Sequence, residues 1–152
     1  MPEPTPDRPG RAVGIDLGAR RIGVAVSDSA GTLATPRTTL VRSGDPGRDR
    51  RALVELVREE EAVVVVVGHP LSLDGSRGPA ATAAEQEAEA LAEALAPHGV
   101  RVELFDERLT TVTAHQALSA GGTRGRDQRA VVDQTAAAVL LEAWLDGRRA
   151  AR

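Results

Sequence analysis

Five consecutive valines constrain the fold of this chain more than any other feature. They lie within the apolar segment Ala62–Gly68. A strand with one face in water alternates apolar and polar residues, whereas this segment shows no alternation. It therefore predicts a strand that is buried on both faces, as in the middle of a parallel sheet.

Two helices flank this strand in the sequence. Arg50–Glu60 and Ser76–Ala96 both carry apolar residues at helical spacing. The apolar stripe of the second helix consists of Ala80, Ala84, Ala88, Leu91, Ala92 and Leu95. Its glutamates Glu85, Glu89 and Glu93 share another face, which we interpret as a solvated face.

The other strands are predicted from short β-type segments. Ala12–Asp16 and Ile22–Ser27 form a hairpin, because only a short glycine-containing loop separates them. Leu33–Leu40 is a third strand, and Pro36 within it indicates an edge position. Arg101–Asp106 is a strand that follows the second helix.

Two further helices are expected near the carboxyl end. One is capped by Thr110 or Thr111 and runs to about Ala120, and the last is capped by Asp127 and runs to about Asp146. The element order β-β-β-α-β-α-β-α-α predicts an α/β domain whose mixed sheet is flanked by helices. This is the ribonuclease-H-like layout.

The length of 152 residues fits one domain. We expect that domain over residues 11–147, after a disordered, proline-rich lead of residues 1–10 and before a basic tail of residues 148–152. The absence of cysteine excludes a disulfide scaffold, a thiolate zinc site and a cysteine nucleophile.

Hydropathy and charge indicate where the protein acts and which partners it can have. The longest apolar run, Ala62–Val67, is far shorter than the ~20 residues of a membrane-spanning helix, and no signal segment opens the chain. We therefore expect a cytoplasmic protein that does not contact a membrane. The net charge of −3 does not exclude a nucleic-acid partner, because the charges of a protein can be segregated on its surface.

Acidic residues at three places in the sequence contradict the surrounding pattern of apolar residues. Asp16 ends a strand that is a candidate for the centre of the sheet, where an unpaired carboxylate costs several kcal/mol. Asp106 and Glu107 stand where the strand Arg101–Phe105 ends, and ligands bind at such strand ends in open α/β sheets. Asp133 lies on the apolar face of the last helix, which it shares with Ala137, Leu140 and Trp144.

Each acid alone also fits a structural role: a turn for Asp16, an internal ion pair for Asp106 or Glu107, and a helix first turn for Asp133. Together, they could converge on one point. Clustered carboxylates suit Mg²⁺ or Mn²⁺. Two such ions, ~3.5–4 Å apart, can activate a water and stabilise the leaving oxygen of a phosphodiester.

Arginines accompany these acids in the sequence. They are Arg20 and Arg21 after Asp16, Arg108 after Glu107, and Arg124 and Arg126 before Asp133. We expect them to hold phosphates of the substrate if the acids meet. The alternative is that they are scattered surface arginines in a chain that contains no lysine.

Four ordered motifs resemble the YqgF family, the Holliday-junction-resolvase-like proteins also described as pre-16S rRNA nucleases. They are GIDLGARRIGVAVSD (residues 14–28), VGHP with DGS (67–70 and 74–76), DERLTT (106–111) and VDQTAA (132–137). His69 departs from the apolar residue that is ordinary at its position, and we interpret it as loop variation.

The resemblance implies a ribonuclease-H-like fold and a divalent-metal nuclease. It implies Asp16, Glu107 and Asp133 as the catalytic, metal-binding triad, with Asp106 as second choice for the middle ligand. The leading hypothesis is maturation of the 5′ end of pre-16S rRNA, with the ribosomal precursor particle as a further partner. A Holliday-junction or other DNA nuclease is the first alternative, and a non-catalytic nucleic-acid-binding factor is the second. An actin-like kinase is disfavoured, because it needs two such domains.

Overall fold

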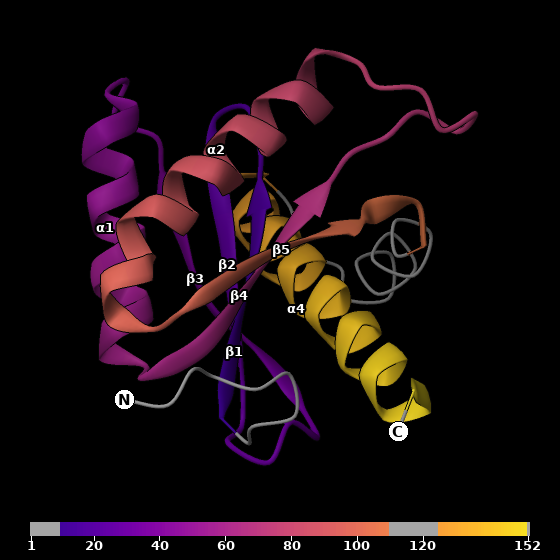
Figure 1. Cartoon of the computed structure of the whole chain (residues 1–152). Coiled ribbons are helices and arrows are strands. Elements are labelled where there is room, and N and C mark those ends of the chain that lie inside the picture. Colours follow the sequence, from indigo (N-terminus) through magenta and orange to yellow (C-terminus); the bar gives the residue numbers. More distant parts are fainter. Residues whose placement is uncertain (1–9, 110–124, 152) are drawn as a thin grey trace.

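The computed structural model of the chain describes residues 10–109 and 125–151 (Figure 1). Apart from Gly10, the expected disordered lead lies outside these residues. The expected helix from Thr110 or Thr111 to about Ala120 lies outside them as well.

A five-stranded mixed sheet forms the centre of the molecule, in the order β3-β2-β1-β4-β5. β1 pairs with β2, and β2 with β3, in antiparallel fashion, whereas β4 is parallel to both β1 and β5. The strands are β1 (Arg11–Leu17), β2 (Arg21–Ser27), β3 (Ala34–Val41), β4 (Ala62–His69) and β5 (Arg101–Asp106). The sheet confirms the predicted mixed topology and the edge position of the strand that contains Pro36.

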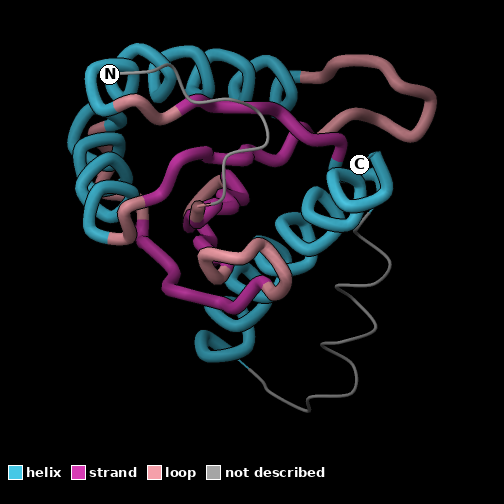
Figure 2. Tube along the Cα trace, turned by 60° about the horizontal axis from the view of Figure 1, so that its bottom comes forward, coloured by secondary structure: helices cyan, strands magenta, loops and turns pink. Residues whose placement is uncertain are grey.

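Helices cover both faces of the sheet. Helices α1 (Pro46–Glu59) and α2 (Pro79–Leu95) lie on one face, and α4 (Gly125–Ala151) crosses the other (Figures 1 and 2). Two short 3₁₀ turns, η1 (Ala96–His98) and η2 (Glu107–Leu109), precede and follow β5.

The valine segment is buried on both sides, as the sequence predicts. Val65 and Val67 pack into the core beneath α1 and α2, and Val64 and Val66 pack into the core beneath α4. All four side chains are at most 3% exposed. β4 therefore joins the two cores, and β1 beside it carries Asp16, which is partly exposed, just past the last residue paired with β4.

Three helices differ in detail from the sequence prediction. α1 begins at Pro46, four residues early, because the Asp45 carboxylate accepts hydrogen bonds from the N–H groups of Gly47 and Arg48. α4 begins at Gly125, so Asp127, the expected cap, is its third residue, and the helix continues through the expected basic tail to Ala151. In α2 the buried stripe begins at Ala81, whereas Ala80 is exposed.

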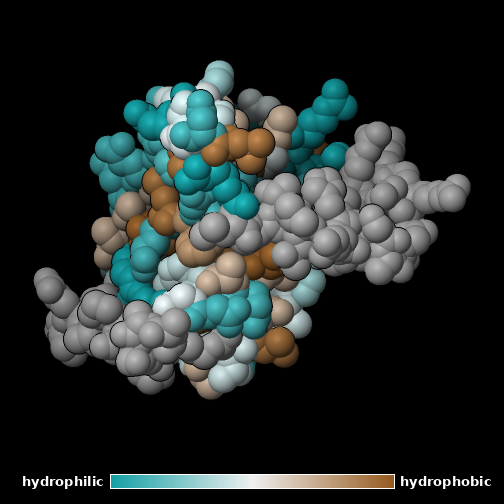
Figure 3. All heavy atoms as spheres, turned by 90° about the vertical axis from the view of Figure 1, so that its right-hand side faces the viewer, coloured by the Kyte–Doolittle hydropathy of each residue, from teal (hydrophilic) through white to brown (hydrophobic). Residues whose placement is uncertain are grey.

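Surface hydropathy is mixed. On the face shown in Figure 3, hydrophilic and hydrophobic residues are interspersed over the coloured part of the surface. The large apolar side chains exposed among the described residues are Leu33, Val41, Leu73 and Leu104. None of the helices in the described part of the chain is both long and apolar enough to cross a bilayer.

Candidate active site

Asp16 and Asp133 approach each other because β2 carries a glycine between them. In the β1–β2 ladder, Asp16 is the direct partner of Gly23. A Cβ atom on Gly23 would overlap the backbone carbonyl of Asp133 in α4. The missing side chain thus lets the backbone of α4 rest on the sheet next to Asp16.

A second glycine brings Glu107 to the same place. A Cβ atom on Gly68, near the end of β4, would overlap the Glu107 carboxyl group. Gly68 lies on the α4 side of β4, because Val64 and Val66 point to that side and side chains alternate along a strand. Glu107, the first residue of η2, therefore bends back over β4, and its carboxyl group is hydrogen-bonded to that of Asp16.

The titration of the acids reflects this crowding. Burial raises the pKa of Glu107 to about 9, with further contributions from the Asp16 hydrogen bond and from the charges of Asp16 and Asp106. Without a cation, the Asp16–Glu107 pair therefore holds a proton at neutral pH. Burial also raises the pKa of Asp133, against the opposing effect of Arg21.

Arg21 neutralises Asp133. The Nε of Arg21, the first residue of β2, donates a hydrogen bond of 2.9 Å to Oδ2 of Asp133. The side chains are 26% and 18% exposed, so the pair is only partly screened by water. Arg21 is thus the residue that balances the third acid of the group.

The three acids do not form a finished metal cage. Within residues 10–109 and 125–151, no three acidic, histidine or cysteine side chains are arranged to hold one ion. The ion pair with Arg21 also occupies an oxygen of Asp133. Asp16 and Glu107 nevertheless fit a hard divalent cation, because two partly buried carboxyl groups that share a proton can exchange it for a metal ion.

Asp106 occupies a different environment from Glu107. The Arg108 guanidinium binds both of its carboxylate oxygens, at 2.9 Å and 2.6 Å to Oδ2 and 3.0 Å to Oδ1. This ion pair is the main cause that lowers the pKa of Asp106. Arg108 also donates to the carbonyl oxygen of Leu73 at 3.4 Å. The structure therefore brings Glu107, and not Asp106, to Asp16.

The predicted phosphate-binding arginines differ in their placement. Arg20 is exposed in the β1–β2 turn, and its carbonyl oxygen accepts a hydrogen bond from the N–H of Arg42. Arg21 and Arg108 are held by Asp133 and Asp106. Arg124 and the side chain of Arg126 lie outside the described residues.

Sequence reasoning missed a contact next to this site. His69 is not part of a variable loop but is the last residue of β4, and its Nε2 lies 2.7 Å from Oε2 of Glu85. Glu85 also pairs with Arg77 and is partly exposed, whereas Glu89 and Glu93 are exposed as expected. The available signal was the histidine itself, a polar residue at the end of a buried valine strand.

Comparison with known proteins connects this geometry to a family. Proteins named “Putative pre-16S rRNA nuclease” match 96% of this chain. The one from Mycobacterium sp. strain KMS is 51% identical, with 89% of its length covered. Those from Mycobacterium leprae strain Br4923 and Rhodococcus opacus strain B4 are 53% and 48% identical, with 77% and 86% of their lengths covered.

Solved structures show the same fold. RuvC of T. thermophilus, in complex with a Holliday junction substrate, is 17% identical with a TM-score of 0.60, over 93% of this chain and 96% of RuvC. The yeast mitochondrial Holliday junction resolvase Ydc2 is 13% identical with a TM-score of 0.58, over 93% of this chain and 80% of Ydc2. These likenesses confirm the predicted ribonuclease-H-like layout. The family model described as “RuvX: Holliday junction resolvase” matches residues 10–147, and the chain therefore belongs to the RuvX family.

Proposed function

We propose that this protein is a divalent-metal-dependent nuclease whose site consists of Asp16, Glu107 and Asp133. The observation that carries the proposal is the convergence of Asp16 and Glu107 over Gly68, with Asp133 of α4 against the neighbouring Gly23. Two partly buried carboxyl groups in contact are costly without a cation. Cation binding accounts for that arrangement.

All ligands in this group are carboxylates, which favours Mg²⁺ or Mn²⁺ over softer metals. Asp16 and Glu107 would hold the ion first, and Asp133 would complete the site after it leaves Arg21. Bound divalent ions would supply an activated water and charge stabilisation at the leaving oxygen of a phosphodiester.

The arginines of the site would act on the substrate. An Arg21 guanidinium released from Asp133 is free to donate to a phosphate oxygen. Arg20 is exposed beside it in the same turn. Arg108, Arg124 and Arg126 remain candidates for further phosphate contacts, with Arg108 already oriented by Asp106.

We infer that the substrate is pre-16S rRNA, cleaved toward its 5′ end, and that the enzyme meets it within a ribosomal precursor particle. The relatives that carry this name share about half of their residues with the chain. A DNA junction is the second candidate, favoured by the family description and by the likeness to RuvC. The acidic group does not distinguish RNA from DNA, because both present the same phosphodiester.

The test is cleavage by purified protein with Mg²⁺ or Mn²⁺. The substrates are a pre-16S rRNA 5′ fragment and a four-way DNA junction of matched label and concentration. We expect the rRNA fragment to be cut and Asp16→Asn to abolish cleavage. Asp28→Asn, an exposed acid in the β2–β3 turn, is the matched control and should remain active. Activity that survives Asp16→Asn contradicts the mechanism, and cleavage of the junction alone contradicts the substrate.

A further inference from the structure

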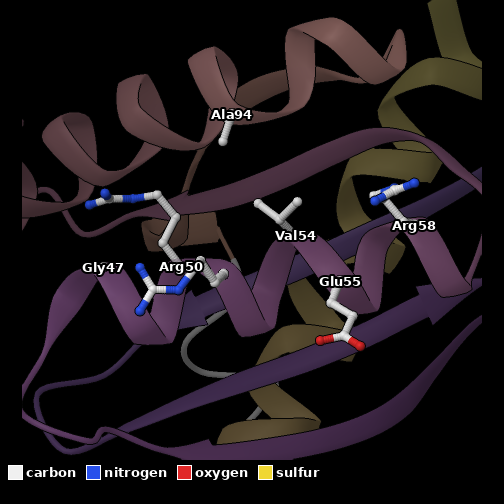
Figure 4. A pocket seen from close by; sticks show the side chains of 7 residues that line it. Gly47, Arg50, Val54, Glu55, Arg58 and Ala94 are labelled. Carbon is white, nitrogen blue, oxygen red and sulfur yellow. The ribbon is translucent and has the colours of Figure 1, made fainter.

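A groove runs between α1 and α2, on the face of the sheet opposite α4. It consists of two adjoining cavities of about 510 and 470 Å³, and Arg50 lines both. The second cavity follows α1 from Gly47 to Arg58, with Ala94 of α2 on its other side (Figure 4).

The groove opens at the sheet edge that carries the acidic group. Leu17 and Gly18, which line the first cavity, directly follow Asp16 in the chain. Nε of Arg42 donates to the Gly18 carbonyl oxygen at 2.7 Å and fixes this end of the groove. The groove therefore begins at the same end of the sheet as Asp16 but on the opposite face, and a strand held at Asp16 would cross this end of the sheet to enter it.

The lining of the groove is basic in a chain of net charge −3. Four arginines (Arg42, Arg50, Arg51 and Arg58) and two glutamates (Glu55 and Glu87) line the two cavities, a net charge of +2. Glu87 is bound to Arg50 at 2.6 Å and 3.0 Å. In Figure 4, Val54 points toward α2, whereas Glu55 points away from it.

Arg51 and Arg58 provide the available charge. They stand seven residues apart, so they lie on one face of α1, about 10 Å apart along its axis, with Glu55 between them. Both are exposed, and neither forms an ion pair with any residue that the structure describes.

The surroundings limit what the groove can bind. The α2 wall is built from small side chains, including Ala80, Ala83 and Ala84. Beyond Arg58, the end of α1 carries Glu59, Glu60 and Glu61, which line a separate cavity and would repel phosphate. Arg50 of α1 and Glu87 of α2 are joined across the groove at 2.6 Å, so a bound strand would lie along the surface of the groove and not between the two helices.

We propose that the α1–α2 groove binds the phosphate backbone of a single-stranded segment of the substrate that extends from the acidic group, with Arg51 and Arg58 as its main contacts. The inference rests on the proposed nuclease function and adds a binding surface outside the site. Backbone contacts are the expected mode, because aromatic residues make up 1% of the chain and Trp144 is buried, which leaves little surface for base stacking.

The test is RNA binding in the Asp16→Asn background, which separates binding from cleavage. Fluorescence anisotropy with a labelled 12-nucleotide single-stranded RNA should show that Arg51→Gln/Arg58→Gln weakens affinity about tenfold at low salt. The slope of log K against log salt should become shallower by about 1.4, since each lost phosphate contact on a single strand contributes about 0.7. A DNA strand of the same sequence should lose affinity similarly.

The matched control is Arg11→Gln/Arg37→Gln, which makes the same charge change at the two partners of Glu60, away from the groove. It should alter affinity less than twofold. Arg51→Lys/Arg58→Lys, which keeps the charge, should restore most of the binding. Circular dichroism shows that each variant is folded, and single Arg58→Gln replaces the double variant if that one does not fold.

Three outcomes would contradict the proposal that the groove binds RNA. They are no RNA binding by the Asp16→Asn protein, unchanged affinity in Arg51→Gln/Arg58→Gln, and an equal loss in the control. A small phosphodiester, bis(p-nitrophenyl) phosphate, reports on the acidic group alone, and its hydrolysis should be the same with or without Arg51 and Arg58. If the wild type does not hydrolyse bis(p-nitrophenyl) phosphate, the proposed nuclease function is contradicted. If Arg51→Gln/Arg58→Gln has lost RNA binding in the same series, binding in the groove is still supported.

Discussion

Gly23 of β2 lies beneath the backbone carbonyl of Asp133 in α4, at a distance that leaves no room for a Cβ atom. Gly23 is also the direct ladder partner of Asp16. One missing side chain therefore sets the separation between two acids that are 117 positions apart in the sequence. The contact is both a packing requirement and a requirement of the proposed site.

Gly23→Ala should displace α4 from the sheet. The added methyl group overlaps backbone, which cannot rotate away, and overpacking of this kind costs about 1–3 kcal/mol in the free energy of unfolding. Urea denaturation measures the loss, and cleavage activity should fall with it because Asp133 moves away from Asp16. Gly147→Ala in the same helix meets no atom within 4 Å and is the control. It should stabilise the protein by up to about 1 kcal/mol. Equal stability of the two variants would contradict the packing argument.

Glu107→Gln and Asp106→Asn separate the two adjacent acids. Glu107 contacts Asp16, whereas Asp106 is bound by Arg108. We expect Glu107→Gln to lower the cleavage rate by about a thousandfold or more, since a lost charge at a metal ligand removes several kcal/mol of stabilisation. Asp106→Asn should lower it by less than tenfold. Calorimetric titration with Mn²⁺ should show weaker binding for Glu107→Gln alone, and the reverse order would assign the ligand to Asp106.

The metal-free protein should lose a specific part of its stability as pH rises. The pKa of Glu107 is about 9 in the folded protein against an ordinary value of 4.5, so the folded state binds this proton more tightly. The resulting stabilisation is fully present below pH 4.5 and is lost as pH rises to about 9. The stability difference between wild type and Glu107→Gln should therefore decrease over this window.

Denaturation in EDTA at pH 5, 7 and 9 measures that difference. Glu89→Gln, which removes an exposed glutamate from α2, should differ from wild type by the same amount at each pH. A stability difference that stays constant between pH 5 and 9 would show that Glu107 is already charged in the folded protein and would contradict the raised pKa.

Arg21→Gln should strengthen metal binding and weaken catalysis. Arg21 competes with a cation for Asp133, so its removal frees an oxygen ligand. We expect the Kd for Mn²⁺ to fall about threefold or more, while cleavage slows because the phosphate loses a donor. Arg20→Gln changes the same charge in the same turn but leaves the Asp133 ion pair intact, and its Kd for Mn²⁺ should match that of the wild type. Weaker Mn²⁺ binding by Arg21→Gln would indicate that the ion pair holds Asp133 in its ligand position.

Much of the fold follows from local pattern. The valine segment of β4, the hairpin of β1 and β2 and the edge position of β3 are all predicted correctly, because alternation and proline placement act over a few residues. Helix boundaries are less accurate. With Asp45 as its cap, α1 begins four residues earlier than predicted. α4 begins before Asp127, the expected cap, and continues through the expected tail. Helix ends depend on tertiary packing as well as on the capping residue.

The sequence by itself determined which acids oppose the surrounding pattern and the order along the chain of the elements that carry them. Only the tertiary structure decided that Glu107, and not Asp106, reaches Asp16, and that Asp133 is held by Arg21. The physical reason is that these choices depend on space provided by other elements. Gly68 of β4 makes room for Glu107, and Gly23 of β2 makes room for α4. The residue patterns of β5 and α4 alone do not indicate that a neighbouring strand carries a glycine at the point of contact.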